Sequence, residues 1–241
     1  GPGDEVITQS FTFVATIEAI LALGAQPIVL DINNTYNLDY SLIENVITKK
    51  TKLIIPVHML GNQCQMDEVL NIGKKYNIPV MEDACEALGA EYKDFKIGSL
   101  SKVGIFSLDF AKTITTGEGG LIITNDDNLH NICREFHDHG HQSNKLFPRG
   151  KDSRNIYGLN LRMSELQAAV GIAQVDKLDF IVEKALDYNL GARGLRSLCE
   201  GILSDAMFEL PESEVKELKI TKAYAEEKIG KVIHPDLKVV S

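Results

Sequence analysis

The sequence predicts an α/β protein with a mostly parallel sheet, and two observations support this fold class. Short apolar runs of strand length alternate four times with segments of helix length in residues 1–81. Alternation of this kind is typical of βαβ units, whose strands run parallel and whose helices cover the faces of the sheet. The chain of 241 residues, 44% of them hydrophobic, is also long enough to bury a sizeable core.

The expected elements follow in chain order. Short apolar runs between turn-forming residues predict strands at 6–8, 27–31, 52–57, 78–81, 103–106 and 121–124. Apolar residues at helical spacing, or a charged stretch without breakers, predict helices at 13–23, 41–47, 66–76, 126–137, from 165 toward 198, and at 212–227. Gly24 stops the first of these helices, and Ser164 caps the one that begins at residue 165.

Net charge and cysteine spacing limit the classes of protein to which this sequence can belong. A formal net charge of −9 argues against a general nucleic-acid binder, which usually presents a basic face. No apolar stretch is long enough to span a bilayer, and no signal peptide opens the sequence. The cysteines, which form no Cys-x-x-Cys pair, are Cys64, Cys85, Cys133 and Cys199. Reduced, structural thiols in a cytoplasmic protein are therefore expected.

Two ionisable side chains follow neighbouring expected strands. Asp83 comes soon after the apolar run 78–81, and Lys112 follows the run 103–106 and precedes a Gly/Thr-rich turn. The carboxyl ends of strands in an open α/β sheet are where ligands bind, and glycines allow the backbone to pass close to a ligand. Asp83 and Lys112 are therefore candidates for one site.

An acid and a lysine at this edge of the sheet favour pyridoxal phosphate chemistry. A lysine amine holds that cofactor as a Schiff base, while an Asp pairs with the protonated pyridine nitrogen, so that the ring accepts electrons from a substrate carbanion. From the residues alone the alternative stays open that Asp83 caps a helix and Lys112 is solvated. His58, a single histidine at the end of the strand 52–57, is expected to be hydrogen-bonded structure rather than a base.

Several segments carry a resemblance to a known family. They read Gly-Asp-Glu-Val-Ile-Thr at 3–8, Glu-Asp-Ala at 82–84, Lys-Thr-Ile-Thr-Thr-Gly-Glu-Gly-Gly at 112–120 and Asn-Leu-Arg-Met at 160–163, with further matches at 10–16, 55–58 and 106–107. In this order and at this spacing, the first 180 or so residues resemble the DegT/DnrJ/EryC1/StrS family of pyridoxal-phosphate-dependent aminotransferases, which act on nucleotide-linked keto-sugars.

The resemblance implies a fold and a domain organisation. Residues 1–180 are expected to form the three-layer large domain of the fold type I enzymes, without the N-terminal segment that helps to hold the cofactor phosphate in the family. Residues 181–241 are expected to continue the long helix and to supply an incomplete C-terminal portion. The sequence thus looks truncated at both ends.

The resemblance also implies an activity. It is the transfer of an amino group from glutamate or glutamine to a nucleotide-linked keto-deoxy-sugar, in the biosynthesis of lipopolysaccharide, other cell-surface polysaccharides or secondary metabolites. Relatives that are deoxy-sugar dehydratases with the same cofactor carry His where this chain has Lys112, which favours the aminotransferase. A shortened, non-catalytic remnant or interaction subunit of the same fold is the remaining alternative.

The family pattern implies a role for each matching residue. Lys112 and Asp83 are the catalytic pair, and Asp83 also contacts the cofactor. Phe13 stacks on the pyridine ring, Glu86 lies near the phenolic oxygen, and Ser107 binds the cofactor phosphate. Without the resemblance, Phe13 would be interpreted as a plain core aromatic.

The segment 139–162 is the most basic part of the chain, and we interpret it as a loop that offers donors to a nucleotide diphosphate. Its candidate substrate-binding residues are His139, Lys145, Arg154 and Arg162. A solvated loop is the alternative. Asn160, by the resemblance, reaches the cofactor phosphate of the partner subunit, which implies a homodimer. The alternating His137, His139 and His141 fit tetrahedral zinc poorly, so no metal is predicted.

Overall fold

The computed structural model describes residues 1–187, and for residue 149 and residues 184–187 it describes the backbone alone. The strands are β1 (Glu5–Gln9), β2 (Gln26–Leu30), β3 (Thr51–Ile54), β4 (Met81–Asp83), β5 (Glu91–Tyr92), β6 (Phe95–Lys96), β7 (Val103–Ser107) and β8 (Gly120–Ile123). The α-helices are α1 (Val14–Ala22), α2 (Met66–Tyr76), α3 (Asp127–Phe136), α4 (Glu165–Val175) and α5 (Leu178–Asp187). Short 3-10 helices lie at Tyr40–Asn45, Met59–Gly61 and Arg149–Lys151.

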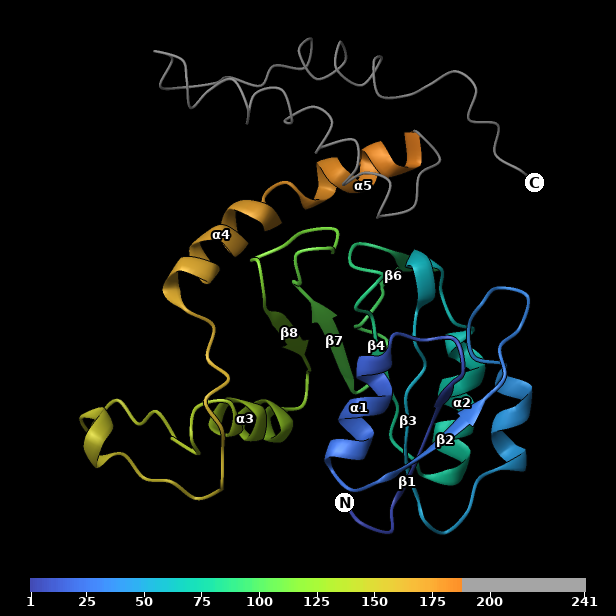
Figure 1. Cartoon of the computed structure of the whole chain (residues 1–241), viewed down its shortest axis with the longest axis horizontal. Coiled ribbons are helices and arrows are strands. Elements are labelled where there is room, and N and C mark those ends of the chain that lie inside the picture. The colour runs from blue at the N-terminus through green and yellow to red at the C-terminus, as the bar shows by residue number, and fades with distance from the viewer. Residues whose placement is uncertain (188–241) are drawn as a thin grey trace.

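The strands stand side by side in the order β2-β1-β3-β4-β7-β8 (Figure 1). Strand β1 pairs in parallel with β2 and β3, and β4 pairs in parallel with β7. Isolated parallel bridges, Ile54 with Val80 and Val57 with Asp83, join β3 to β4. The predicted α/β fold with a mostly parallel sheet is therefore confirmed, and Asp83 lies at the carboxyl end of a central strand.

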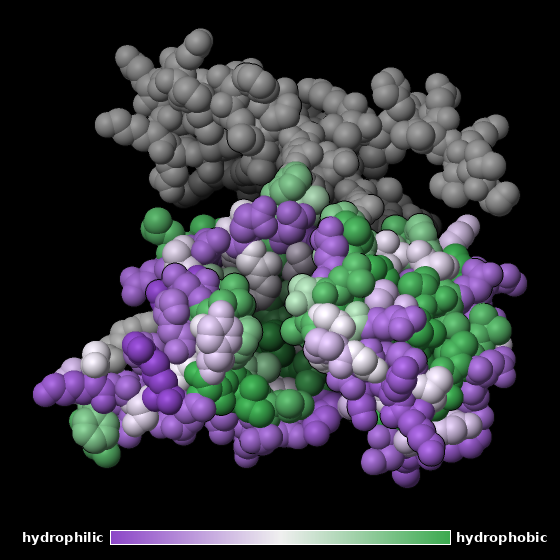
Figure 2. Space-filling model, turned by 60° about the horizontal axis from the view of Figure 1, so that its bottom comes forward, coloured by the Kyte–Doolittle hydropathy of each residue, from purple (hydrophilic) through white to green (hydrophobic). Residues whose placement is uncertain are grey.

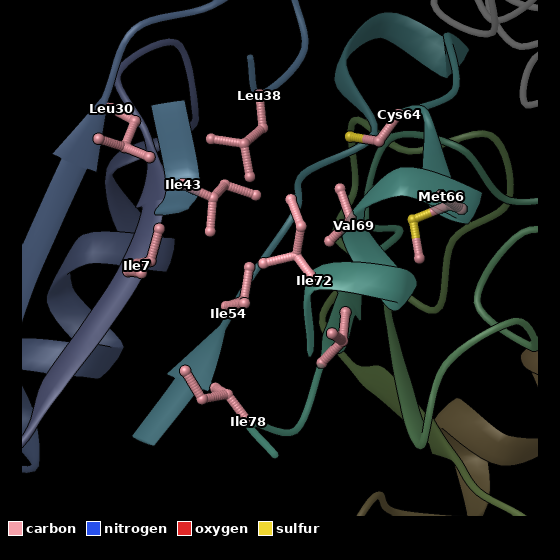
Figure 3. Packing of buried hydrophobic residues seen from close by; sticks show 11 residues of the cluster. Ile7, Leu30, Leu38, Ile43, Ile54, Cys64, Met66, Val69, Ile72 and Ile78 are labelled. Atoms are coloured by element: carbon pink, nitrogen blue, oxygen red, sulfur yellow. The ribbon is translucent and has the colours of Figure 1, made fainter. Parts of the chain in front are cut away.

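The sheet is covered on both faces, which gives three layers. On one face Ile7 of β1 and Ile54 of β3 pack with Met66, Val69 and Ile72 of α2 (Figure 3). On the other face, Val6 and Ile55 pack with Ile20 of α1 and with Ala25. Neighbouring residues of one strand point to opposite faces, so the adjacent pairs Val6-Ile7 and Ile54-Ile55 each supply both layers.

Strand β8 runs antiparallel to β7 and ends the strand order. All of its residues are exposed, including Leu121, Ile122 and Ile123. Figure 2 shows hydrophobic residues gathered around a hollow in the middle of the face that it displays. Apolar side chains at a sheet edge are normally covered by another element or another chain.

Several expected helices differ in type or extent. The segment expected as a helix at 41–47 is a 3-10 helix at Tyr40–Asn45, where the Asp39 carboxylate accepts the N–H of Ser41. The helix expected to run from 165 toward 198 ends at Val175, and α5 begins at Leu178. The N–H of Lys177 bonds to the carbonyl of Gln174, three residues back, so the α-helical pattern is interrupted there.

The remaining expectations about the C-terminal part fall mostly outside the described residues. The domain boundary expected near residue 180 lies within α5, and the boundary itself stays a prediction. The helix expected at 212–227 and Cys199 lie beyond residue 187. Cys64, Cys85 and Cys133 are free thiols. Among residues 1–187, no helix is both long enough and apolar enough to cross a membrane.

Candidate functional site

Asp83 ends β4 as a buried carboxylate with defined hydrogen-bond partners. The residue is 5% exposed. Oδ2 accepts a hydrogen bond from the Thr16 hydroxyl at 2.8 Å, and Oδ1 accepts the N–H of Cys85 at 3.2 Å. Its backbone is fixed as well, because its N–H donates to Pro56 and its carbonyl accepts from His58, each at 3.0 Å. Four hydrogen bonds therefore hold Asp83 in place at the carboxyl edge of the sheet.

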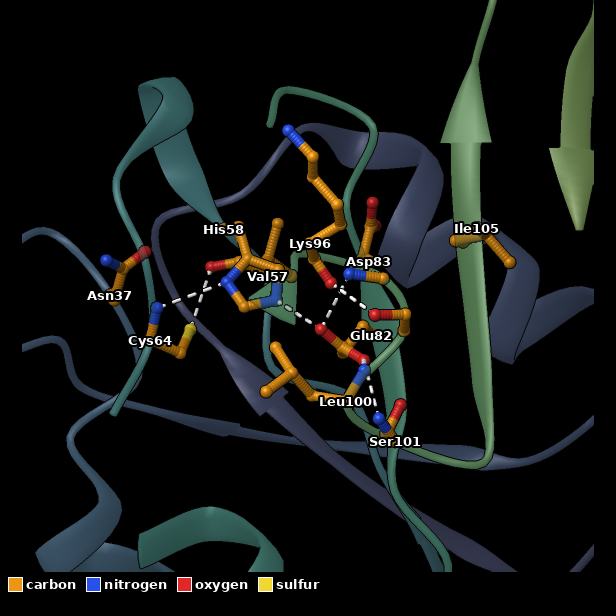
Figure 4. Close-up of polar contacts among 12 residues, drawn as sticks. Asn37, Val57, His58, Cys64, Glu82, Asp83, Lys96, Leu100, Ser101 and Ile105 are labelled. Carbon is orange, nitrogen blue, oxygen red and sulfur yellow. Dashed lines mark hydrogen bonds and ion pairs between the residues drawn. The ribbon is translucent and has the colours of Figure 1, made fainter. Parts of the chain in front are cut away.

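The neighbouring acid, Glu82, points to the other face of the strand and is fully buried (Figure 4). Its Oε1 accepts the N–H groups of Leu100 and Ser101, at 2.9 and 2.7 Å. Its Oε2 accepts the N–H of Gly98 at 2.8 Å and lies 3.3 Å from Nε2 of His58. Each of these four partners is a donor, as an ionised carboxylate requires.

These donors decide the charge of Glu82. Burial raises the pKa of its carboxyl, but hydrogen bonds from His58 and from the backbone of Gly98 and Ser101 outweigh burial and hold that pKa below its usual value. Nδ1 of His58 accepts the N–H of Cys64 at 3.1 Å, so the ring proton is on Nε2, where it is donated to Glu82. His58 is thus part of the buried scaffold, in agreement with the structural role expected for it.

Two thiols next to this scaffold are held in the protonated form. Burial raises the pKa of Cys64 to about 12, and the negative charges of Glu82 and Asp83 add to the increase. Burial also raises the pKa of Cys85, again with a contribution from Asp83. A thiol is nucleophilic only as a thiolate, so neither cysteine is a candidate nucleophile.

Lys112 reaches the same edge of the sheet as Asp83. Its side chain is 15% exposed, and Nζ lies 3.9 Å from Oε1 of Glu86, a distance compatible with an ion pair. The N–H of Leu60 donates to Oε2 of Glu86 at 3.2 Å. Leu60 has a φ of 56°, a conformation that is rare for a bulky side chain, and this conformation accompanies the contact of its N–H with Glu86.

The turn after Lys112 is fixed by its threonines. The Thr115 hydroxyl and the N–H of Thr116 both donate to the carbonyl of Leu108, at 3.1 and 3.0 Å. Gly117 has a φ of 83°, in the left-handed region that favours glycine. The N–H of Lys112 donates to the carbonyl of Asp109 at 3.1 Å. Local hydrogen bonds therefore fix the backbone at Lys112, through Asp109, and at the turn that follows it, through Leu108.

Phe13 and Ser107 lie on elements that border Asp83. Phe13 is the N-cap residue of α1, and the residue is 63% exposed, so it is not the core aromatic that its sequence context alone suggests. Thr16, one turn later on α1, is the residue that bonds to Asp83. Ser107 ends β7, two residues beyond Ile105, the strand partner of Asp83. Its Oγ accepts the N–H of Asp109 at 3.2 Å.

The basic segment between α3 and α4 is not near this edge. Figure 1 shows it on the outer side of β8, away from β4. There Arg162 pairs with Asp138 at 2.6 Å, and Arg154 donates to Nε2 of the buried His141 at 3.1 Å. The side chains of His139, Lys145 and Asn160 are exposed. Within one chain, these candidate residues are therefore separated from Asp83 and Lys112.

His137 and His141 have separate partners. Nδ1 of His137 donates to the carbonyl of Arg134 at 2.6 Å, while Nδ1 of His141 faces Oδ2 of Asp152 at 3.5 Å. In the described part of the chain, no three His, Cys, Asp or Glu side chains are grouped as metal ligands.

Three positions of the site went unrecognised in the sequence. Thr16 looks like any threonine of an amphipathic helix, Leu60 like an apolar residue in a loop, and Glu82 like a second acid beside Asp83. The alternation of side chains along a strand was the available signal for Glu82, because adjacent residues of β4 must point to opposite faces.

A separate cavity of about 550 Å³ lies at the opposite end of the sheet, where β3 begins. Its lining residues are Ile47, Thr48, Lys49, Thr51, Lys52, Tyr76, Asn77, Ile78 and Pro79. None of the candidate site residues lines it, and ligands of open α/β sheets bind at the carboxyl ends of the strands. The edge that carries Asp83 and Lys112 is therefore the candidate site.

Comparison with known solved structures supports the fold. Helicobacter pylori PseC, an aminotransferase involved in the biosynthesis of pseudoaminic acid, superimposes with a TM-score of 0.73 at 30% identity, over 85% of this chain and 53% of that one. NtdA of Bacillus subtilis, solved with bound cofactor PMP, superimposes with a TM-score of 0.68 at 34% identity, over 75% of this chain and 40% of that one.

Comparison with known sequences also finds related proteins. The GDP-perosamine synthase of Caulobacter vibrioides is 43% identical over 182 residues, which are 74% of this chain and 47% of that protein. The UDP-2-acetamido-2-deoxy-3-oxo-D-glucuronate aminotransferase of Pseudomonas aeruginosa is 42% identical over 178 residues, 73% of this chain and 48% of that protein. The chain thus spans about half the length of these relatives. Because a model of the family matches residues 1–201, the chain belongs to the DegT/DnrJ/EryC1/StrS aminotransferase family.

Proposed function

We propose that this chain carries the catalytic site of a pyridoxal-phosphate-dependent aminotransferase that acts on a nucleotide-linked keto-deoxy-sugar. One observation carries the proposal: a buried carboxylate, Asp83, and a half-buried lysine, Lys112, share the carboxyl edge of the parallel sheet. The named relatives that make GDP-perosamine or aminate a UDP-linked sugar support the substrate class.

The donor set suits the cofactor. When bound, pyridoxal phosphate supplies an electron-accepting ring and a carbonyl carbon that carries the amino group. The buried charge of Asp83 would favour the protonated form of the ring nitrogen, since an opposite charge nearby stabilises the charged form of a base. The exposed ring of Phe13 is available for stacking, and the Ser107 hydroxyl is available to the phosphate.

Lys112 is the group to which we assign attachment of the cofactor and proton movement. An amine on a flexible four-carbon stem can reach both the carbon that loses a proton and the carbon that receives it. Glu86, 3.9 Å from the amine, stabilises the ammonium that forms when Lys112 takes up that proton. Lysine at this position also favours amino transfer over the dehydratase alternative.

The site would be completed by a second copy of the chain. Asn160, the proposed phosphate ligand from the partner subunit, is exposed and lies in the segment that is separated from its own chain's Asp83. The proposed substrate-binding residues His139, Lys145, Arg154 and Arg162 belong to the same segment. A homodimer would bring this segment of one subunit to the site of the other, and closed two-fold dimers are the commonest assembly.

Exposed apolar residues offer a surface for such a dimer. They are Leu121, Ile122 and Ile123 of β8, and Leu166, Val170, Ile172 and Val175 of α4. Glutamate or glutamine is the proposed amino donor, and polysaccharide or secondary-metabolite sugar biosynthesis the proposed pathway class. We place the reaction in the cytoplasm, consistent with the free thiols of Cys64, Cys85 and Cys133.

The test is attachment of the cofactor to one lysine. Pyridoxal phosphate is added to the purified chain, the visible spectrum is recorded, and borohydride reduction is followed by peptide mass mapping. We expect a visible band and a label on Lys112, both lost in Lys112→Ala and both kept in Lys93→Ala, an exposed lysine on the β5–β6 turn. A folded wild-type chain without band or label would overturn the proposal.

A further inference from the structure

Asp83 is held by a hydroxyl that the family pattern did not bring to attention. Thr16, in the first turn of α1, is 8% exposed, and its Oγ1 lies 2.8 Å from Oδ2 of Asp83. A second hydroxyl, Oγ1 of the half-buried Thr12, lies 2.8 Å from Oγ1 of Thr16. These contacts connect three oxygen atoms in series, from Oγ1 of Thr12 through Oγ1 of Thr16 to Oδ2 of the buried Asp83.

The direction of these hydrogen bonds follows from the number of protons that each group can donate. An ionised carboxylate only accepts hydrogen bonds, and a threonine hydroxyl has one proton to donate. Thr16 must donate its proton to Asp83, so its oxygen can only accept from Thr12. The alternative acceptor of the Thr12 hydroxyl, the carbonyl of Phe13, is farther away at 3.3 Å. The hydrogen bonds therefore run from Thr12 to Thr16 to Asp83.

We propose that Thr16, supported by Thr12, is a positioning residue that orients the Asp83 carboxylate and keeps the proton on the cofactor's ring nitrogen. This role rests on the proposed function. A hydrogen bond donated to a carboxylate stabilises its ionised form, and hydrogen bonds in a chain polarise one another. A carboxylate stabilised in this way takes a proton from the pyridinium less readily, so the ring keeps the positive charge.

The same helix turn links two contacts of the cofactor. Phe13 caps α1, and the N–H of Thr16 donates to the Phe13 carbonyl at 3.2 Å. The residue proposed to stack on the ring and the residue that orients the ring's counter-ion are therefore one turn apart. A shift of α1 would move both together, which gives the start of α1 a role in cofactor geometry.

The experiment compares variants of Thr16 with a matched control. Thr16→Val keeps the shape and removes the hydroxyl, and Thr16→Ser restores it. The control is Thr8→Val, because the Thr8 hydroxyl is fully buried in the same sheet but donates to the carbonyl of Ile55 at 2.9 Å. The readouts are the dissociation constant of pyridoxal phosphate and the ¹⁵N chemical shift of its labelled ring nitrogen in the complex.

We expect Thr16→Val to weaken cofactor binding roughly tenfold, the usual effect of losing a hydrogen bond to a charged group. Its ¹⁵N signal should move toward that of neutral pyridine. Thr16→Ser should match the wild type in both readouts, and Thr8→Val should leave the ¹⁵N signal unchanged. Thr12→Val should shift the ¹⁵N signal less than Thr16→Val, in the same direction, and should add nothing in the Thr16→Val background.

The outcomes separate this role from the proposed function. If the wild type binds the cofactor and Thr16→Val gives the wild-type ¹⁵N signal, the role of Thr16 is wrong and the proposed function stands. If the folded wild type does not bind the cofactor, both are wrong. Should Thr16→Val fail to fold, Thr12→Val decides the question, since an unchanged ¹⁵N signal there would overturn the chain of hydroxyls.

Discussion

Nε2 of His58 lies 3.3 Å from Oε2 of Glu82, and both side chains are fully buried. The histidine is neutral by geometry, because its other nitrogen accepts the N–H of Cys64. The pair is therefore a hydrogen bond between a neutral donor and an anion rather than an ion pair. It fixes β4 from the face opposite Asp83, so the scaffold and the site share one strand.

Replacing Glu82 by Gln is expected to destabilise the fold strongly. The carboxylate accepts four hydrogen bonds, and an amide would turn its NH2 group toward N–H donors. Breaking such a buried, charged network costs about 3 kcal/mol or more. Urea unfolding measures the loss. Glu44→Gln is the matched control: its contacts with Lys75 and Tyr76 are exposed to solvent, so their loss should destabilise the fold far less than the Glu82 substitution. Equal losses in the two variants would contradict this account.

Stability should also fall in acid because of Glu82. Its pKa in the folded chain lies below the ordinary value of 4.5, so its contribution is fully present above that pH. The contribution is lost as the pH falls through the folded pKa, where the carboxylate takes up a proton. The free energy of unfolding, measured by urea titration between pH 6 and pH 3, should therefore fall more steeply for wild type than for Glu82→Gln. Parallel curves would argue against a depressed pKa.

Gly104→Ala is expected to disrupt the same network from the side of β7. A Cβ atom on Gly104 would lie 2.0 Å from the carbonyl oxygen of Gly98. The turn that carries the N–H groups of Gly98 and Leu100 would have to move away from Glu82. We expect a loss of about 3 kcal/mol or more in the free energy of unfolding. Gly150→Ala, where a Cβ meets nothing within 4 Å, should change stability by less than about 0.5 kcal/mol.

The N-terminal cap of α4 is expected to make a smaller contribution to the free energy of unfolding. The Ser164 hydroxyl accepts the N–H of Gln167, whose side chain in turn accepts the N–H of Ser164, which together form a capping box. Ser164→Ala should lower the free energy of unfolding by about 1 kcal/mol. Thermal or urea unfolding measures it, with the exposed loop residue Ser153 changed to Ala for comparison. No difference between the two variants would show that the cap does not stabilise the fold.

Local patterns predicted much of the fold. The helix expected at 66–76 matches α2, because its apolar residues follow one face and Asn77 ends it in the left-handed conformation. The expected start of α3 at Asp126 is confirmed, since the carboxylate caps the helix by accepting the N–H groups of Asn128 and Leu129. The direction of β8 could not be predicted, because an apolar run marks a strand but not the way it runs. The two-residue strands β5 and β6 are too short to leave a pattern.

The sequence predicts the positions of candidate site residues that lie at or just after the carboxyl ends of strands. Asp83, the last residue of β4, and Lys112, which follows β7, lie toward the carboxyl edge of the sheet, and their joint role in a site stays a prediction. The Thr16 contact depends on how α1 packs across the sheet, 67 positions away in sequence, and no local pattern encodes it. The ion pair of Arg162 could not be predicted either, since its partner Asp138 comes from a segment that pairs with it only in the folded chain.

The bridges between β3 and β4 have a consequence for motion. Pro56 has no N–H to offer, so β3 and β4 meet through isolated bridges at Val80 and Asp83 rather than through a long ladder. A junction with few cross-links opens at a lower free energy than a continuous strand ladder, so its amides should exchange with solvent sooner than those between β1 and β2. The proposed cofactor contacts span this junction, with Phe13 on one half and Lys112 on the other. Cofactor binding would then hold the two halves of the sheet together. It should slow hydrogen exchange at the His58 and Asp83 amides and stabilise the whole sheet against opening.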